Sequence, residues 1–391
     1  MELPKQINAQ NGDKMNKFYY AINISLHSAG IFNFLVNLGL STSMCLLWGM
    51  VNALQLIVIM PLFNLDFPAN AQLLLSYIFN VAQLDIFPQE KVLFFYDYSN
   101  NSAPLNSQFN LMGLETTNMV ASIGDFFIFM LVYFPLVLLM VPLKLISFKS
   151  TKVKFLYGKL SAWLLFNVPI RIFLEGYTEL AICSFANAIN PNYANTSESF
   201  STTLAFIVMV VVALMPLIIL GISEKFLGKI RKEQVTRIWE LYEGVDTESL
   251  IQIFFNFFFV FRRLLIAITI VFGQHFPYIQ YQILTLLTLF KIIYLFLFEP
   301  FKDKPVLNNE KFNELCVLAC CYHLALFSEV IDDPYLKHRV GWSFVGIVCL
   351  SIFVNTIKVV VEAIAHIKQW IKNKLARRSA KKYATVNVTR Q

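Results

Sequence analysis

Long apolar runs recur almost from one end of this chain to the other, and they constrain its fold more than any other feature. A helix that crosses a bilayer needs about 20 mostly apolar residues, and lipid cannot satisfy an unpaired backbone group. The runs reach this length, and charged residues make up only 15% of the sequence while hydrophobic residues make up 57%. Soluble proteins usually carry about 25% charged residues. The sequence therefore predicts an all-α, polytopic transmembrane helical bundle with the lipid bilayer as its first partner.

The length criterion gives about nine spans. They cover 43–63, 69–87, 120–143, 160–182, 201–222, 250–272, 278–298, 312–328 and 340–364. Three regions follow from this division, which are a short extracytoplasmic N-terminal tail, a transmembrane helical domain and a basic cytoplasmic tail. They occupy 1–27, 28–365 and 366–391.

The distribution of Lys and Arg predicts the orientation, because cytoplasmic loops carry an excess of both. With the N-terminus outside, the segments 144–159, 223–249, 299–311 and 365–391 become cytoplasmic and hold 5, 5, 3 and 8 basic residues, or 21 in all. The opposite segments hold only six. The C-terminus is then inside, and the number of spans is odd.

Glycosylation triplets give a second indication of the same orientation. Asn23-Ile-Ser, Asn100-Asn-Ser and Asn195-Thr-Ser all begin on predicted outer segments. Asn387-Val-Thr falls on the predicted cytoplasmic tail and should stay unmodified. Asn23, Asn100 and Asn195 are therefore the candidate acceptors, and the chain is expected at the cell surface or in another membrane of the secretory pathway.

Several ionisable residues lie within the predicted spans, where each costs a few kcal/mol and calls for a partner or a function. The basic residues within the predicted spans are Arg171, Arg262, Arg263, Lys291 and Lys358. Asp125 stands near the start of the third span and is a candidate for an outer vestibule. Together with the acidic residues of the fourth span, they form the candidate polar cluster of the membrane domain.

Arg171, Glu175 and Glu179 form the strongest polar pattern, because a spacing of four residues places all three along one helical stripe. One interpretation is a structural ladder, in which Arg171 and Glu175 neutralise each other and Glu179 reaches Arg262 or Arg263. The other is the charged lining of an ion or solute path. Pro169 precedes the stripe and is expected to kink the helix in either case.

The basic residues of the later spans permit different partners. Arg262 and Arg263 are adjacent and lie about 100° apart on a helix, so they cannot both face the same partner. Lys291 lies close enough to the inner boundary to snorkel or to pair with a carboxylate, which we favour over a Schiff-base role. Lys358 is expected to pair with Glu362, four residues later.

The sequence contains no phosphate-binding loop, dinucleotide fingerprint, nucleophile elbow or zinc-protease motif. We therefore do not expect an enzyme, a cofactor or a nucleic-acid partner. Cys316 and Cys320 could share a helical face, but no further ligand stands near them and the five histidines show no metal spacing, so no metal site is expected either.

Several segments of the chain resemble a known family. They are QLIVIMPLFNLDFPAN at 55–70, FNVPIRIFLEGYTELAICS at 166–184, FFFVFRRLLIAITIVF at 257–272 and EPFKDKPVLNNEKFNEL at 299–315. These segments are similar to the C-terminal multi-pass region of large ciliate surface proteins, which is loosely similar to the TRP-like membrane domain of fungal proteins. The resemblance implies a TRP-like helical bundle that could conduct inorganic cations, although this chain lacks the long cysteine-rich ectodomain.

Two functions remain open at this stage. The first is a TRP-like cation channel or transport protein, with Glu175, Glu179 and Asp125 facing a wet path. The second is a structural or scaffold subunit of a larger membrane assembly, whose charges serve helix packing. Either function is expected to involve a homo-oligomer or other membrane subunits as partners.

Overall fold

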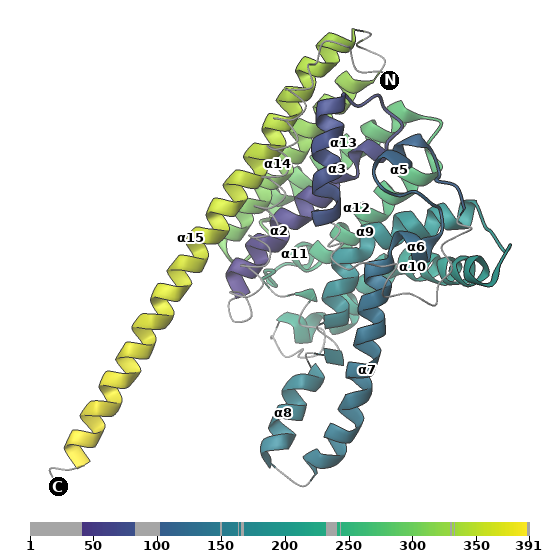
Figure 1. The fold of residues 1–391 in the computed structure, drawn as a ribbon. Helices are drawn as coiled ribbons and strands as arrows, with labels where there is room; N and C mark the ends of the chain where they lie inside the picture. The colour runs from purple at the N-terminus through teal and green to yellow at the C-terminus, as the bar shows by residue number, and fades with distance from the viewer. Residues whose placement is uncertain are drawn as a thin grey trace, which may run out of the picture.

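The computed structural model of the chain describes residues 41–82, 102–148, 151–162, 164–165, 168–231, 241–242, 244–328, 331 and 333–388. Within these ranges the protein is helical and has no β-strand (Figure 1), which confirms the predicted all-α class. In chain order the helices are α2 (Ser41–Val58), η1 (Met60–Leu62), α3 (Ala69–Ala82), α5 (Ser107–Leu111), α6 (Met119–Ser122), α7 (Gly124–Ser147), α8 (Thr151–Ala162), α9 (Val168–Ile189), α10 (Thr196–Arg231), α11 (Leu250–Ile253), α12 (Phe255–Phe272), α13 (Pro277–Phe298), α14 (Lys304–Phe327) and α15 (Pro334–Val388).

Among the described residues, five helices are long and apolar enough to cross a membrane. They are α2 continued through η1, α10, α12, α13 and the first 32 residues of α15. Helices α9 and α14 have 22 and 24 residues and are also long enough, but they carry the charged residues discussed below. Helix α3 has only 14 residues, about 21 Å at 1.5 Å per residue. The structure therefore supports a multi-span membrane protein, while the count of nine stays a prediction.

The helices divide into a buried group and a peripheral group. The apolar window of α2 is 67% buried and that of α12 is 50% buried, against 22% for α10 and 28% for α13. Helix α12 packs against α9, α10 and α13, and α14 packs against α2, α13 and α15. The peripheral helices expose large apolar side chains such as Leu217 on α10 and Leu297 on α13, as expected for lipid-facing surfaces.

Two predicted cytoplasmic loops meet at one end of the bundle. The backbone N–H of Asp246 donates to the carbonyl of Pro300 at 2.8 Å, and that of Lys302 donates to the carbonyl of Gly244 at 3.1 Å. Val245 and Phe301 form an isolated antiparallel bridge between them. The loops 223–249 and 299–311 thus lie on the same side of the bundle, and we call this side the 245/301 end.

The opposite end gathers predicted outer segments, and it also holds the link between the first two predicted spans. Asn64 donates to the carbonyl of Gln274 at 3.4 Å, and Asp66 lies 3.7 Å from the ammonium of Lys337. Successive spans cross the membrane in opposite directions. With the N-terminus outside, the link 64–68 after the first predicted span would therefore lie at the 245/301 end. That part of the predicted topology is wrong, because the polar link binds partners at the other end and α2 runs toward it.

Several predicted loops and tails are helical. The segment 144–159 is largely covered by the end of α7 and by α8, and the basic tail continues α15 as far as Val388. Figure 1 shows the α7–α8 hairpin and the C-terminal part of α15 projecting beyond the bundle on the same side. The fourth predicted span is described from Val168 onward as α9, and residues 164–165 before it are π-helical. Residues 166–167, directly before Val168, lie outside the described structure, so the kink expected at Pro169 stays a prediction.

Candidate functional site: a charged cavity inside the bundle

A cavity of about 130 Å³ lies between helices α2, α9, α12, α13 and α14, with Val245 and Phe301 at one end. By volume it has room for roughly ten water molecules. Its wall contains four basic and three acidic side chains, which are Arg171, Arg262, Arg263, Lys291, Glu175, Glu310 and Glu314. We call it the charged cavity. Five of these residues belong to the predicted polar cluster, and the structure brings them together from three helices.

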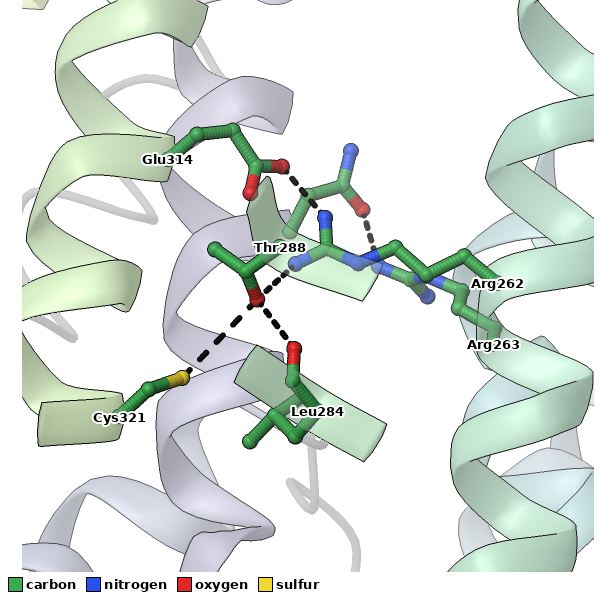
Figure 2. Close-up of polar contacts among 7 residues, drawn as sticks. Arg262, Arg263, Leu284, Thr288, Glu314 and Cys321 are labelled. Carbon is green, nitrogen blue, oxygen red and sulfur yellow. Dashed lines mark hydrogen bonds and ion pairs between the residues drawn. The ribbon is translucent and has the colours of Figure 1, made fainter. Parts of the chain in front are cut away.

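Arg262 is fixed by two neighbouring helices. Its Nη1 donates to Glu314 Oε1 at 2.6 Å on α14, and its Nη2 donates to Thr288 Oγ1 at 2.9 Å on α13. Figure 2 shows Arg262 reaching across to both residues, with Cys321 beside Thr288. Both members of the ion pair have only 8% side-chain exposure. Such a short buried pair is a geometrically specific contact that couples α12 to α14.

Arg263 points to a different helix from Arg262, as their adjacent positions predicted. Its Nη2 donates to Asn52 Oδ1 of α2 at 2.7 Å, and its guanidinium lies 4.3 Å from the ring centroid of Phe259. Only 1% of its surface is exposed, and Nη1 has no hydrogen-bond partner among the described residues. The hydrogen-bond partners of the two arginines are Glu314, Thr288 and Asn52, so the predicted contact with Glu179 is wrong.

Lys291 enters the cavity from α13 and does not snorkel to the boundary. It is 5% exposed, and its Nζ lies 3.8 Å from the ring centroid of Phe255. No described residue accepts a hydrogen bond from this ammonium. A cation over an aromatic face is stabilised by the ring quadrupole, but its N–H donors remain unsatisfied and available to a molecule in the cavity.

Two carboxylates of the wall, those of Glu175 and Glu310, lie among its basic groups. Glu175 Oε2 is buried without a hydrogen-bond partner among the described residues. Glu310 Oε1 lies against Gly49 of α2, where an added Cβ would come within 2.9 Å of it. A glycine at this point of α2 therefore allows Glu310 to lie against the helix backbone. Both carboxylates interact electrostatically with the cationic side of the wall, Glu175 with Arg263 and Glu310 with Lys291.

The sequence analysis did not predict Glu310 and Glu314 as site residues, because Glu310 falls in the predicted loop 299–311 and Glu314 was not among the charges assigned to the predicted spans. The signal was present in NNEKFNEL, where Asn309, Glu310, Asn313 and Glu314 recur at a spacing of four residues. This spacing places them on one face of a helix. In the structure Glu310 and Glu314 line the charged cavity, while Asn309 and Asn313 also hydrogen-bond to Asn355 of α15.

A second, smaller cavity of about 20 Å³ lies farther along α2 and α9. Its lining includes Gln55, Leu62, Glu179 and Leu114, and it shares Glu175 with the charged cavity. Gln55 Nε2 donates to the Glu175 backbone carbonyl at 3.2 Å, so the two helices meet at this level. Leu62 and Leu114 belong to the end of the bundle opposite Val245 and Phe301, so the two cavities follow one another across the bundle.

A chain of asparagines joins α14 to α15 beside the charged cavity. Lys358 donates to Asn309 Oδ1 at 2.9 Å, Asn309 donates to Asn355 Oδ1 at 2.9 Å, and Asn355 donates to Asn313 Oδ1 at 2.7 Å. The predicted partner of Lys358 was Glu362, but the hydrogen bond goes to Asn309 on the neighbouring helix. Asn313 lines the cavity, so this network supports its wall.

The ion pair of Lys311 and Glu299 lies outside the cavity, at the exposed end of α13. Lys311 Nζ donates to Glu299 Oε1 at 2.9 Å, and the Glu299 side chain is 57% exposed. The hydrogen bond and positive charge of Lys311 lower the pKa of Glu299. Lys311 follows Glu310 on α14. Lys311 makes the surface ion pair, and Glu310 lines the charged cavity.

The remaining predicted residues lie elsewhere. Asp125 is the second residue of α7, and its side chain lies outside the described part of the structure, as do Asn23 and Asn100. Asn195 is half-buried before α10, where its Oδ1 accepts a hydrogen bond from the Glu198 N–H at 2.7 Å.

The described residues contain no group of three or more His, Cys, Asp or Glu side chains placed to hold a metal ion. No protein-family model matches the chain, and no curated protein and no solved structure matches it.

Proposed function

We propose that the chain is a membrane transport protein and that the two cavities mark the path of its cargo. The observation that carries this proposal is the position of Glu175, which lines both the charged cavity and the smaller cavity beyond it. The cavities follow α2 and α9 from the 245/301 end to the end that holds Leu62 and Leu114. Ionisable groups inside a bilayer are costly and commonly mark ion or solute paths.

The unsatisfied polar atoms of the wall also support a transport site. Lys291 Nζ, Arg263 Nη1 and Glu175 Oε2 are buried without hydrogen-bond partners among the described residues. Buried polar groups are costly unless they are hydrogen-bonded. Water or a polar solute in the charged cavity would satisfy them, and a dry, closed bundle would not.

The resemblance to TRP-like membrane domains favours an inorganic cation as the cargo. The wall, however, carries four basic and three acidic side chains. A cation that enters would be attracted by Glu175 and Glu310 and repelled by Lys291 and Arg263. We therefore propose transport of a small charged species in general and treat a simple cation channel as one form of it.

The second candidate is a structural subunit of a membrane assembly, and a specific observation favours it. Arg262 bonds to Glu314 and Thr288, and Arg263 bonds to Asn52, so three helices are tied to α12 by direct polar contacts. This is what a structural charge ladder would do. It leaves Lys291, Glu175 and Glu310 without an explanation, which is why we rank it second.

Flux through reconstituted liposomes tests the proposal. Purified protein should carry ions or small charged solutes across the bilayer above the level of empty liposomes, and Glu175→Gln should change the rate or the selectivity by about tenfold, as expected for the loss of one contact to a charged group. Glu115→Gln is the matched control, because Glu115 is exposed and is not part of the lining of either cavity. Absence of flux, or a Glu175→Gln variant that differs from the parent only in thermal stability, would favour the structural subunit.

A further inference from the structure

We infer that the charged cavity binds a zwitterion, a molecule with one anionic and one ammonium group. The anionic group would lie against Lys291 and Arg263, and the ammonium group against Glu175 and Glu310. This inference rests on the proposed use of the cavity as a cargo site and adds the chemical class of the cargo.

The first step of the argument is the presence of unused groups of both signs in one cavity. Lys291 Nζ and Arg263 Nη1 are donors without partners among the described residues, on side chains that are 5% and 1% exposed. Glu175 Oε2 is a buried acceptor without a partner. Glu310 makes no ion pair of its own within the described structure and interacts with Lys291 only at longer range.

The second step is what these groups exclude. A simple anion bound to Lys291 and Arg263 would lie beside the carboxylates of Glu175 and Glu310. A simple cation bound to those carboxylates would lie beside the two basic groups. In a site of low dielectric, each like-charge contact is costly. A molecule that carries both charges satisfies both sides of the wall at once.

The third step is the size and character of the space. A volume of about 130 Å³ accommodates a small solute or a headgroup but not a large one. The aromatic rings of the wall do not provide a second ammonium site, because Trp48, Phe255 and Phe259 already face Arg171, Lys291 and Arg263. The ammonium group of the ligand would therefore be held by the carboxylates, and its anionic group by the basic side chains. The same chemistry is found in free amino-acid-like solutes and in the headgroups of zwitterionic phospholipids, so the experiment must separate these sources.

Calorimetric titration of the full chain in nanodiscs made only of the anionic lipid phosphatidylglycerol supplies the test. The probes are glycine, β-alanine and γ-aminobutyrate, with butyrate and butylammonium as analogues that each lack one charge of γ-aminobutyrate. We expect at least one zwitterion to bind and each singly charged analogue to bind about tenfold more weakly or worse, since a lost contact to a charged group costs about that factor.

Variants of the wall make the test specific to this cavity. Lys291→Met and Glu310→Gln should each weaken binding of the zwitterion by about tenfold, whereas Lys304→Met should not, because Lys304 is exposed. Glu310→Gln preserves the shape of the side chain and remains informative if Lys291→Met does not fold. If phosphatidylethanolamine binds, none of the free zwitterions binds, and the same variants weaken this binding, the zwitterion site is supported and the lipid headgroup is its ligand.

Two results would overturn the inference. One is equal binding of butyrate or butylammonium and γ-aminobutyrate. The other is absence of binding by every zwitterion and by phosphatidylethanolamine. Ion flux that persists in either case would leave the proposed transport function in place, and zwitterion binding without any flux would remove that function and leave the site.

Discussion

The ammonium of Lys291 lies 3.8 Å from the ring centroid of Phe255, inside the membrane bundle, and no described residue accepts a hydrogen bond from it. An ammonium at this depth is costly unless it is paired or hydrated. The charged groups of the wall that act on it are the carboxylates of Glu310 and Glu314 and the guanidinium groups of Arg262 and Arg263. Arg262 and Arg263 line the same cavity, but each donates a hydrogen bond to a neighbouring helix, whereas Lys291 donates to no described residue.

The pair of Arg262 and Glu314 should be a strong contributor to stability. Glu314→Leu removes the carboxylate and leaves the buried guanidinium without its ion-pair partner, so the free energy of unfolding should fall by about 3–5 kcal/mol. Lys311→Met breaks an ion pair with the exposed Glu299 and should lower the free energy of unfolding much less, because water screens exposed charges. Thermal unfolding of both variants in detergent measures the difference. Equal losses would contradict the account, and the double variant Arg262→Leu/Glu314→Leu should recover part of the loss.

Gly49→Ala should alter transport more than stability. The added methyl group would come within 2.9 Å of Glu310 Oε1, and the flexible carboxylate can move away into the cavity at little cost. We expect reduced flux and a free energy of unfolding within about 1 kcal/mol of the parent. Gly346→Ala is the control, because an added Cβ there meets nothing within 4 Å. Unchanged flux in Gly49→Ala would show that Glu310 does not line the path.

Glycan mapping should test the orientation. If the end opposite Val245 and Phe301 faces the secretory lumen, Asn195 can accept a glycan through its Nδ2. Treatment with an N-glycosidase should then increase the mobility of the parent protein on a gel. Asn195→Gln should show a smaller increase, because it carries one glycan fewer. Asn387→Gln should migrate like the parent. A glycan at Asn387 and none at Asn195 would invert the orientation.

Long apolar helices and several residues of the polar cluster were predictable because they depend on local sequence. Apolar runs identified the five described helices that are long and apolar enough to cross a membrane. The cost of a charge inside the bilayer pointed to Arg171, Glu175 and Lys291, which all line the charged cavity. The fold class followed from composition for the same reason.

The pairing of the charges was not predictable, because it depends on which helices are neighbours. Nothing in the local sequence shows that α14 lies beside α12, so Glu314 could not be recognised as the partner of Arg262. The direction of α2 was also missed, since the link 64–68 contains no Lys or Arg and the loop charges leave its side undetermined.

The most direct test of the proposed path uses the native cysteines as reporters. Cys45 lines the charged cavity and Cys183 lines the smaller cavity beyond Glu175. Variants that retain only one of them, with serine at the other cysteine positions, would be reconstituted and their flux measured with and without Ag⁺, a small cation that binds thiolates. The account predicts that Ag⁺ inhibits flux in both the Cys45-only and the Cys183-only protein and leaves the cysteine-free protein unaffected. Flux that Ag⁺ does not inhibit in either single-cysteine protein would contradict the account, because the cargo would then cross the membrane by another route.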